Sequence, residues 1–110
     1  MQRSLPILIL FAIALLIPRW VDAKPAKAKD VEISIKGMKF GPDAVTIKTG
    51  QTVTWTNNDQ RDHTVAATDN SFNSGNLSPG ATFSYKFTKP GTYHYACTLH
   101  PRMKGEIVVK

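Results

Sequence analysis

The lone cysteine of this 110-residue chain, Cys97, is followed at three-residue intervals by His100 and Met103 in the stretch CTLHPRM. A thiol, an imidazole and a thioether are all ligands for soft metal ions, and a thiol beside an imidazole can also be a nucleophile. A single cysteine cannot form an internal disulfide. Cys97 is therefore an inert buried thiol, a reactive nucleophile, an intermolecular bridge or a metal ligand.

Another histidine, far upstream of this stretch, completes a set of metal-binding side chains. Two His and one Cys in a plane, with a weak axial Met, form the blue-copper type of electron-transfer site. The second imidazole must come from outside CTLHPRM. His94 alternates with two tyrosines and is expected on the outer face of its strand, which leaves His63 as the candidate. The predicted copper ligands are His63, Cys97, His100 and Met103.

The elements that would position these ligands are short β-strands. Ile33 and Ile35 alternate with polar residues, as do Val53 and Trp55, and Gly- or Pro-containing turns separate the apolar runs. No stretch after residue 30 shows a sustained helical period. The pattern predicts an all-β fold of seven to eight strands, a β-sandwich or small barrel with Greek-key connections.

The first 23 residues have the features of an export signal. A positive start at Arg3 precedes an apolar run over residues 5–17, and Ala23 ends a small-residue cleavage pattern. The run is shorter than the roughly 20 residues needed to span a bilayer, which disfavours the alternative of an uncleaved anchor. We expect a signal peptide over 1–23, a flexible basic tail over 24–30 and one domain over 31–110.

The charge of the mature chain limits its partners. After cleavage it carries 12 Lys and Arg against 7 Asp and Glu, a net charge of +5 in 87 residues. This excess favours acidic partners or surfaces. No clustered basic stripe or base-stacking motif points to nucleic acid. We expect a monomer with no stable membrane insertion after signal cleavage.

Two long stretches of the chain resemble the cupredoxins, which are small blue-copper electron carriers, and in particular their amicyanin and plastocyanin-like members. FGPDAVTIKTGQTVTWTNNDQRDHTV is similar to the family's Trp strand and first His ligand, and FTKPGTYHYACTLHPRMKGEIVV to its ligand loop and last strand. The C-x2-H-x2-M spacing is the amicyanin form. The resemblance implies a cupredoxin-like Greek-key β-sandwich, one type 1 copper ion on the four predicted ligands, and single-electron transfer without substrate turnover.

Two positions depart from the family pattern. Thr64 stands where many members have an Asn that ties the ligand loops together, and a hydroxyl has fewer donors than an amide, so we expect a weaker link. Leu99 stands where amicyanins and plastocyanins have Pro. Its backbone N–H could donate to the Cys97 sulfur, favour the reduced state and raise the reduction potential.

The resemblance also places the ring edge of His100 at a solvent-facing, mostly apolar end of the molecule, where electrons would enter and leave. Weak redox encounters use small contact areas with electrostatic guidance, so we expect an acidic docking face on the redox partner. An alternative for Leu77 is a place in the core, and for the arginines a solvated surface. The candidate contact residues are Leu77, Leu99, Pro101, Arg61 and Arg102.

Other functions use some of the same residues. A periplasmic copper-binding or delivery protein needs overlapping ligands and is the main alternative. A cysteine nucleophile is disfavoured because no acidic partner is evident near either candidate histidine and Met103 would have no role. A metal-free basic binding domain rests on the net charge alone. The sequence thus predicts a periplasmic copper protein that passes electrons and is not an enzyme.

Overall fold

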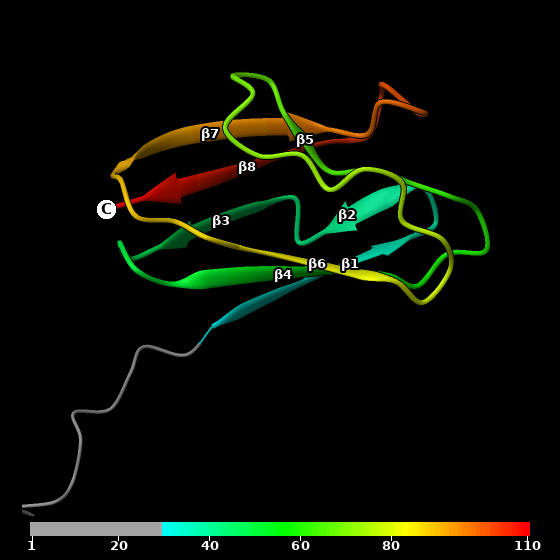
Figure 1. Cartoon of the computed structure of the whole chain (residues 1–110), viewed down its shortest axis with the longest axis horizontal. Coiled ribbons are helices and arrows are strands. Elements are labelled where there is room, and N and C mark those ends of the chain that lie inside the picture. The colour runs from blue at the N-terminus through cyan, green and yellow to red at the C-terminus, as the bar shows by residue number, and fades with distance from the viewer. Residues whose placement is uncertain (1–29) are drawn as a thin grey trace, which may run out of the picture.

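The computed structural model describes residues 30–110, which form two four-stranded β-sheets facing each other (Figure 1). The expected signal peptide and the tail up to residue 29 lie outside the described residues. No helix of the described part is long and apolar enough to cross a membrane. The strands are β1 (Val31–Lys36), β2 (Lys39–Gly41), β3 (Ala44–Ile47), β4 (Thr52–Asn57), β5 (Ala66–Ala67), β6 (Thr82–Lys86), β7 (Gly91–Ala96) and β8 (Lys104–Val109).

The order of the strands confirms a Greek-key sandwich. One sheet has the order β2-β1-β4-β6 and the other β3-β8-β7-β5. The pairs β1–β4 and β3–β8 are parallel and the remaining pairs antiparallel. Parallel neighbours cannot be joined by a tight hairpin, so the chain passes from one sheet to the other between β2 and β7. The eight strands agree with the expected seven to eight.

The core lies between the sheets because each central strand alternates apolar and polar residues. On β4, Val53 and Trp55 are fully buried, as are Ile33 and Ile35 on the neighbouring β1. Trp55 meets Tyr95 of the opposite sheet edge to face, with ring centroids 5.4 Å apart. Such aromatic pairs add about 0.5–1.5 kcal/mol beyond their buried area. This contact therefore helps to hold the two layers together.

The loops that carry the predicted ligands meet at one end of the sandwich. The β4–β5 connection and the β7–β8 connection both lie at the end opposite the C-terminus (Figure 1). The β4–β5 loop is fixed there by a two-residue bridge: His63 N donates to Leu77 O at 3.1 Å, and Leu77 N donates to His63 O at 2.7 Å. This bridge joins it to the long β5–β6 connection.

Candidate metal centre

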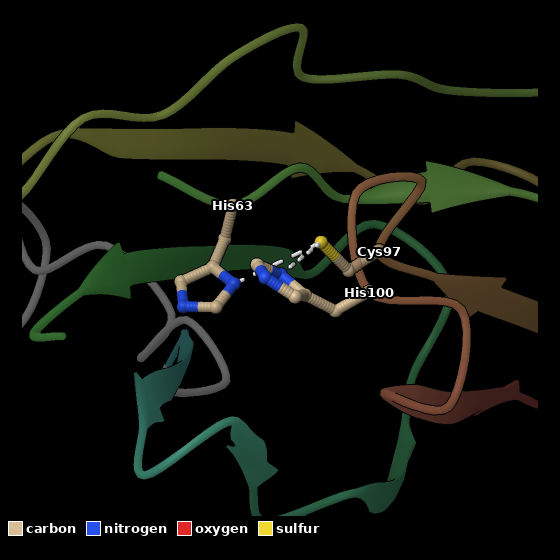
Figure 2. A group of neighbouring side chains, drawn as sticks. All are labelled: His63, Cys97 and His100. Atoms are coloured by element: carbon tan, nitrogen blue, oxygen red, sulfur yellow. Dashed lines mark hydrogen bonds between the residues drawn. The ribbon is translucent and has the colours of Figure 1, made fainter. Parts of the chain in front are cut away.

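Three of the four predicted ligands converge on one point. The Sγ of Cys97 lies 3.8 Å from Nδ1 of His63 and 3.7 Å from Nδ1 of His100, and the three candidate ligand atoms all lie within 4.8 Å of one another. Figure 2 shows both rings beside the sulfur. His63 and Cys97 are fully buried, whereas His100 is half-buried. His94 is exposed on β7 and takes no part, as expected.

Met103 is brought back beside Cys97 by the folding of the β7–β8 loop. Its N–H donates to the His100 carbonyl at 2.9 Å, and its carbonyl accepts the Cys97 N–H at 3.1 Å. Its side chain is 4 % exposed. Met103 also lines a surface hollow together with His100. The loop is thus a closed turn that keeps Met103 at the same end of the sandwich as the three clustered residues.

A buried amide, Asn57, shapes the loop that leads to His63. It occupies the third inward position of β4 and has no exposed surface. Its Nδ2 donates to the carbonyls of Arg61 and Leu77, both at 2.8 Å, and its Oδ1 accepts the Asp59 N–H at 2.9 Å. A buried amide satisfied in this way fixes the backbone around it, because breaking any of these bonds leaves a polar group unpaired.

A carboxylate holds the outer nitrogen of the His63 ring. Nε2 of His63 lies 2.9 Å from Oδ2 of Asp59. The hydrogen bond with His63, followed by the bond from the Met38 N–H, lowers the pKa of Asp59 below its ordinary value. Because an ionised carboxylate can only accept, Nε2 of His63 donates its proton to Asp59, and Nδ1 is the ring nitrogen that faces Cys97. The expectation of no acidic partner near either histidine was therefore wrong.

The same carboxylate also binds the turn between β1 and β2. Gly37 N donates to Oδ1 of Asp59 at 3.3 Å and Met38 N donates to Oδ2 at 3.1 Å. Both turn residues have positive φ, 62° and 60°, as a two-residue hairpin turn requires. Positive φ costs a non-glycine residue about 1–2 kcal/mol. The bond to Asp59 offsets part of this cost at Met38.

The surroundings of Cys97 favour its ionised form. Burial raises the pKa of the Cys97 thiol, but hydrogen bonds from the Thr64 N–H, from the rings of His63 and His100 and from the Leu99 N–H outweigh it. Together they lower the pKa from 9.0 to about 6. The Thr64 N–H lies 3.3 Å from the sulfur. The thiol is thus poised to become the thiolate that binds metal ions.

A pair of threonines joins the two ligand loops. Oγ1 of Thr64 accepts the Thr98 N–H at 2.7 Å and lies 2.9 Å from Oγ1 of Thr98. The hydroxyl therefore makes two contacts across the loops, although the sequence led us to expect a weaker link at this position. Thr98 was not among the predicted site residues. No periodic pattern singles it out, because its partner is 34 positions away in the sequence.

The exposed surface around His100 is mostly apolar. A hollow of about 440 Å³ lies there, and Leu99, 52 % exposed, and Met38, 37 % exposed, are the two large exposed apolar side chains of the described chain. Leu77 is only 4 % exposed, which contradicts its place on this surface and agrees with the alternative of a place in the core. Its backbone pairing with His63 turns it into the core. The lining residues are Met38, Leu99, His100, Pro101, Arg102 and Met103.

Comparison with known proteins identifies the family. Residues 6–109 match the model of the cupredoxin-like domain. The chain belongs to the cupredoxin family. It is 41 % identical over 90 residues to amicyanin-alpha of Methylorubrum extorquens, covering 77 % of this chain and 76 % of that protein. It is 33 % identical over 97 residues to the amicyanin of Paracoccus versutus, covering 79 % and 74 %.

Solved structures give the same result. A purple cupredoxin from Nitrosopumilus maritimus superposes with a TM-score of 0.70 at 32 % identity, covering 74 % of this chain and 100 % of that one. A mutant amicyanin in the Cu(I) state superposes with a TM-score of 0.69 at 30 % identity, covering 77 % and 86 %.

Proposed function

We propose that this protein is a blue-copper electron carrier that binds one type 1 copper ion. The observation that carries the proposal is the convergence of two imidazole nitrogens and one buried sulfur within 4.8 Å of one another. Thiolate and imidazole together suit both oxidation states of copper, and a thioether is the usual weak axial ligand. Membership of the cupredoxin family supports the assignment. The proposed ligands are His63, Cys97, His100 and Met103.

Copper bound here would supply one-electron exchange between Cu(I) and Cu(II). The contribution of the chain is to hold the ligands in one arrangement, so that little has to move when the charge changes. Asp59 orients the ring of His63, and the Thr64–Thr98 contact ties the two loops together. Four protein ligands leave no open position for a substrate, unlike catalytic metal sites. This argues for a carrier and against an enzyme.

His100 is the proposed route for electrons into and out of the protein. It is the more exposed of the two clustered histidines and lines the apolar hollow. Leu99 and Pro101 are exposed beside it. A partner that covers this apolar rim excludes water around the ring edge while burying little surface, as transient redox encounters do. We add Met38 to this contact surface, because it lines the hollow, and we leave out Leu77, because it is buried.

The proposed redox partner presents an acidic face. A second hollow of about 260 Å³ is lined by three cations, Lys39, Arg102 and Lys104, with Asp43 as the single acid. It shares Met38, Arg102 and Met103 with the apolar hollow. Carboxylates of a partner could therefore meet these cations while its apolar side chains cover His100. Arg61, exposed on the other ligand loop, is a further candidate for steering.

We further propose that the protein is exported to the periplasm, loses residues 1–23 and works as a monomer. The support is the pattern of the first 23 residues: a positive start, an apolar run and a small residue before the cut. The mass of the protein recovered from the periplasm of a bacterial host tests export and cleavage. A mass that begins at Lys24 supports cleavage, and a mass that includes Met1 contradicts it.

Electrochemistry with metal analysis tests the electron-carrier function. One copper per chain should be retained through repeated one-electron cycles. Copper delivery, the alternative, predicts that the ion leaves to an acceptor or chelator in one of the two oxidation states. A protein that cycles reversibly without losing copper supports the carrier, and one that releases copper on each reduction contradicts it.

A further inference from the structure

The hydroxyl group of Thr64 has three polar neighbours near the sulfur of Cys97. The Thr98 N–H donates to it at 2.7 Å, Oγ1 of Thr98 lies at 2.9 Å and Sγ of Cys97 at 3.9 Å. Thr64 is 7 % exposed, so water can do little to satisfy this group. Its single proton must therefore go to one of the last two neighbours.

The proton count limits the choice. A hydroxyl has one proton and two acceptor positions. The Thr98 N–H uses one acceptor position of the Thr64 oxygen, and the Thr98 hydroxyl can use the other by donating. The Thr64 proton is then free to point at the sulfur. In the opposite arrangement, Thr64 donates to Thr98 and the sulfur receives nothing from this hydroxyl.

Charge and exposure favour the first arrangement. A thiolate carries negative charge and can only accept, and hydrogen bonds to a charged acceptor are about twice as strong as neutral ones. Cys97 is fully buried, so water cannot donate a hydrogen bond to its sulfur. Thr98 is exposed, so its hydroxyl can form hydrogen bonds with water instead. The proton gains more at the sulfur than at Thr98, although the distance to sulfur is the longer one.

We propose that the Thr64 side chain donates its hydroxyl proton to the Cys97 sulfur, while the N–H and O–H of Thr98 saturate the Thr64 oxygen. The inference rests on the proposed copper function. The sulfur then has a hydroxyl donor beside the Thr64 backbone N–H, which lies at 3.3 Å. Each donor draws electron density from the thiolate and stabilises it most when the site is reduced. Thr64 thus tunes the site as well as linking the loops.

Three substitutions isolate the hydroxyl. Thr64→Val keeps the shape of the side chain and the backbone N–H and removes only the hydroxyl. Thr64→Ser keeps the hydroxyl. Thr98→Val removes the other hydroxyl of the pair and keeps the Thr98 N–H. Thermal unfolding of each copper-free variant shows whether the fold survives.

The measurements are the midpoint reduction potential and the energy of the thiolate-to-copper absorption. We expect Thr64→Val to lower the potential and shift the absorption to longer wavelength, Thr64→Ser to restore both, and Thr98→Val not to raise the potential. If Thr64→Val leaves both unchanged, or if Thr98→Val raises the potential by freeing a proton that had pointed at Thr98, the inference is wrong. A wild-type protein without this absorption would instead overturn the proposed copper function.

Discussion

Nε2 of His63 lies 2.9 Å from Oδ2 of Asp59, and the same carboxylate accepts the N–H of Met38 at 3.1 Å. Met38 lines the apolar hollow beside His100. One carboxylate therefore connects a buried candidate ligand with the turn that borders the proposed contact surface. An acid at this place fixes which nitrogen of His63 is protonated and how the ring is oriented, which is the role of carboxylates behind metal-bound histidines.

Removing this carboxylate should weaken copper binding. Partners behind ligating histidines typically contribute about 10–100-fold to metal affinity. We expect Asp59→Ala to lower copper affinity within that range, measured by competition with a chelator of known Cu(I) affinity. Asp69→Ala is the control, because Asp69 is another hydrogen-bonded carboxylate with a lowered pKa but bonds to Ser71. Equal affinity of the Asp59 variant and wild type would contradict the role given to Asp59.

The backbone N–H of Leu99 should raise the reduction potential. This group contributes to lowering the pKa of Cys97, and a donor to the sulfur favours the electron-rich reduced state. We expect Leu99→Pro, which removes the N–H, to lower the midpoint potential, while Leu99→Ala leaves it nearly unchanged. Voltammetry of the wild type and the two variants measures their midpoint potentials. An unchanged or higher potential in the proline variant would show that this N–H does not tune the site.

Charge reversal at Arg102 should slow electron exchange with anions. Arg102 lines both the basic and the apolar hollow, so negative reagents are drawn to it next to His100. We expect Arg102→Glu to reduce the rate of oxidation of the reduced protein by hexacyanoferrate(III) several-fold at low ionic strength, with the difference shrinking as salt is added.

Lys89→Glu provides the control for this charge reversal. Lys89 is exposed in the β6–β7 connection, near the opposite end of the sandwich. The Lys89→Glu substitution therefore changes the net charge by the same amount as Arg102→Glu, but at a site away from His100. If both variants slow the reaction equally, only the net charge matters and the basic hollow has no steering role.

The metal-free protein should become more stable as the pH rises from about 6 toward 9. The folded state lowers the pKa of the Cys97 thiol from 9.0 to about 6. Between these values the unfolded chain binds a proton at this thiol that the folded chain has lost, so stability increases with pH. This contribution to stability is lost as the pH falls to the pKa of Cys97 in the folded protein, about 6.

Urea unfolding at several pH values checks this prediction, with Cys97→Ala as the control that removes the titrating group. The difference in the free energy of unfolding between the wild type and this variant should grow in favour of the wild type across the window. A difference that is constant with pH would show that the folded thiol keeps an ordinary pKa.

The regular part of the molecule could be predicted from the sequence because strand alternation is a local property. The period of two places Val53 and Trp55 in the core and His94 on the outside, and the structure agrees. The spacing of Cys97 and His100 likewise predicted that these two residues of the cluster lie close together. In these cases the information lies within a few neighbouring residues.

The partners of the ligands could not be predicted because they depend on contacts between loops. Asp59 lies in a polar loop without periodicity, and its bond to His63 follows from the way Asn57 folds that loop. Leu77 is buried because its backbone pairs with His63, 14 positions earlier. Thr98 meets Thr64 only after both loops reach the same end of the sandwich. Such pairings are decided by tertiary structure.

The visible absorption spectrum of the mature protein with Cu(II) tests the central claim most directly. If Cys97 binds copper with His63 and His100, the oxidised protein should show intense thiolate-to-copper absorption, which disappears on reduction and is absent from Cys97→Ser. Copper analysis of both proteins accompanies the spectra. A wild-type protein that stays colourless with Cu(II) and keeps a freely reactive thiol would contradict the copper site.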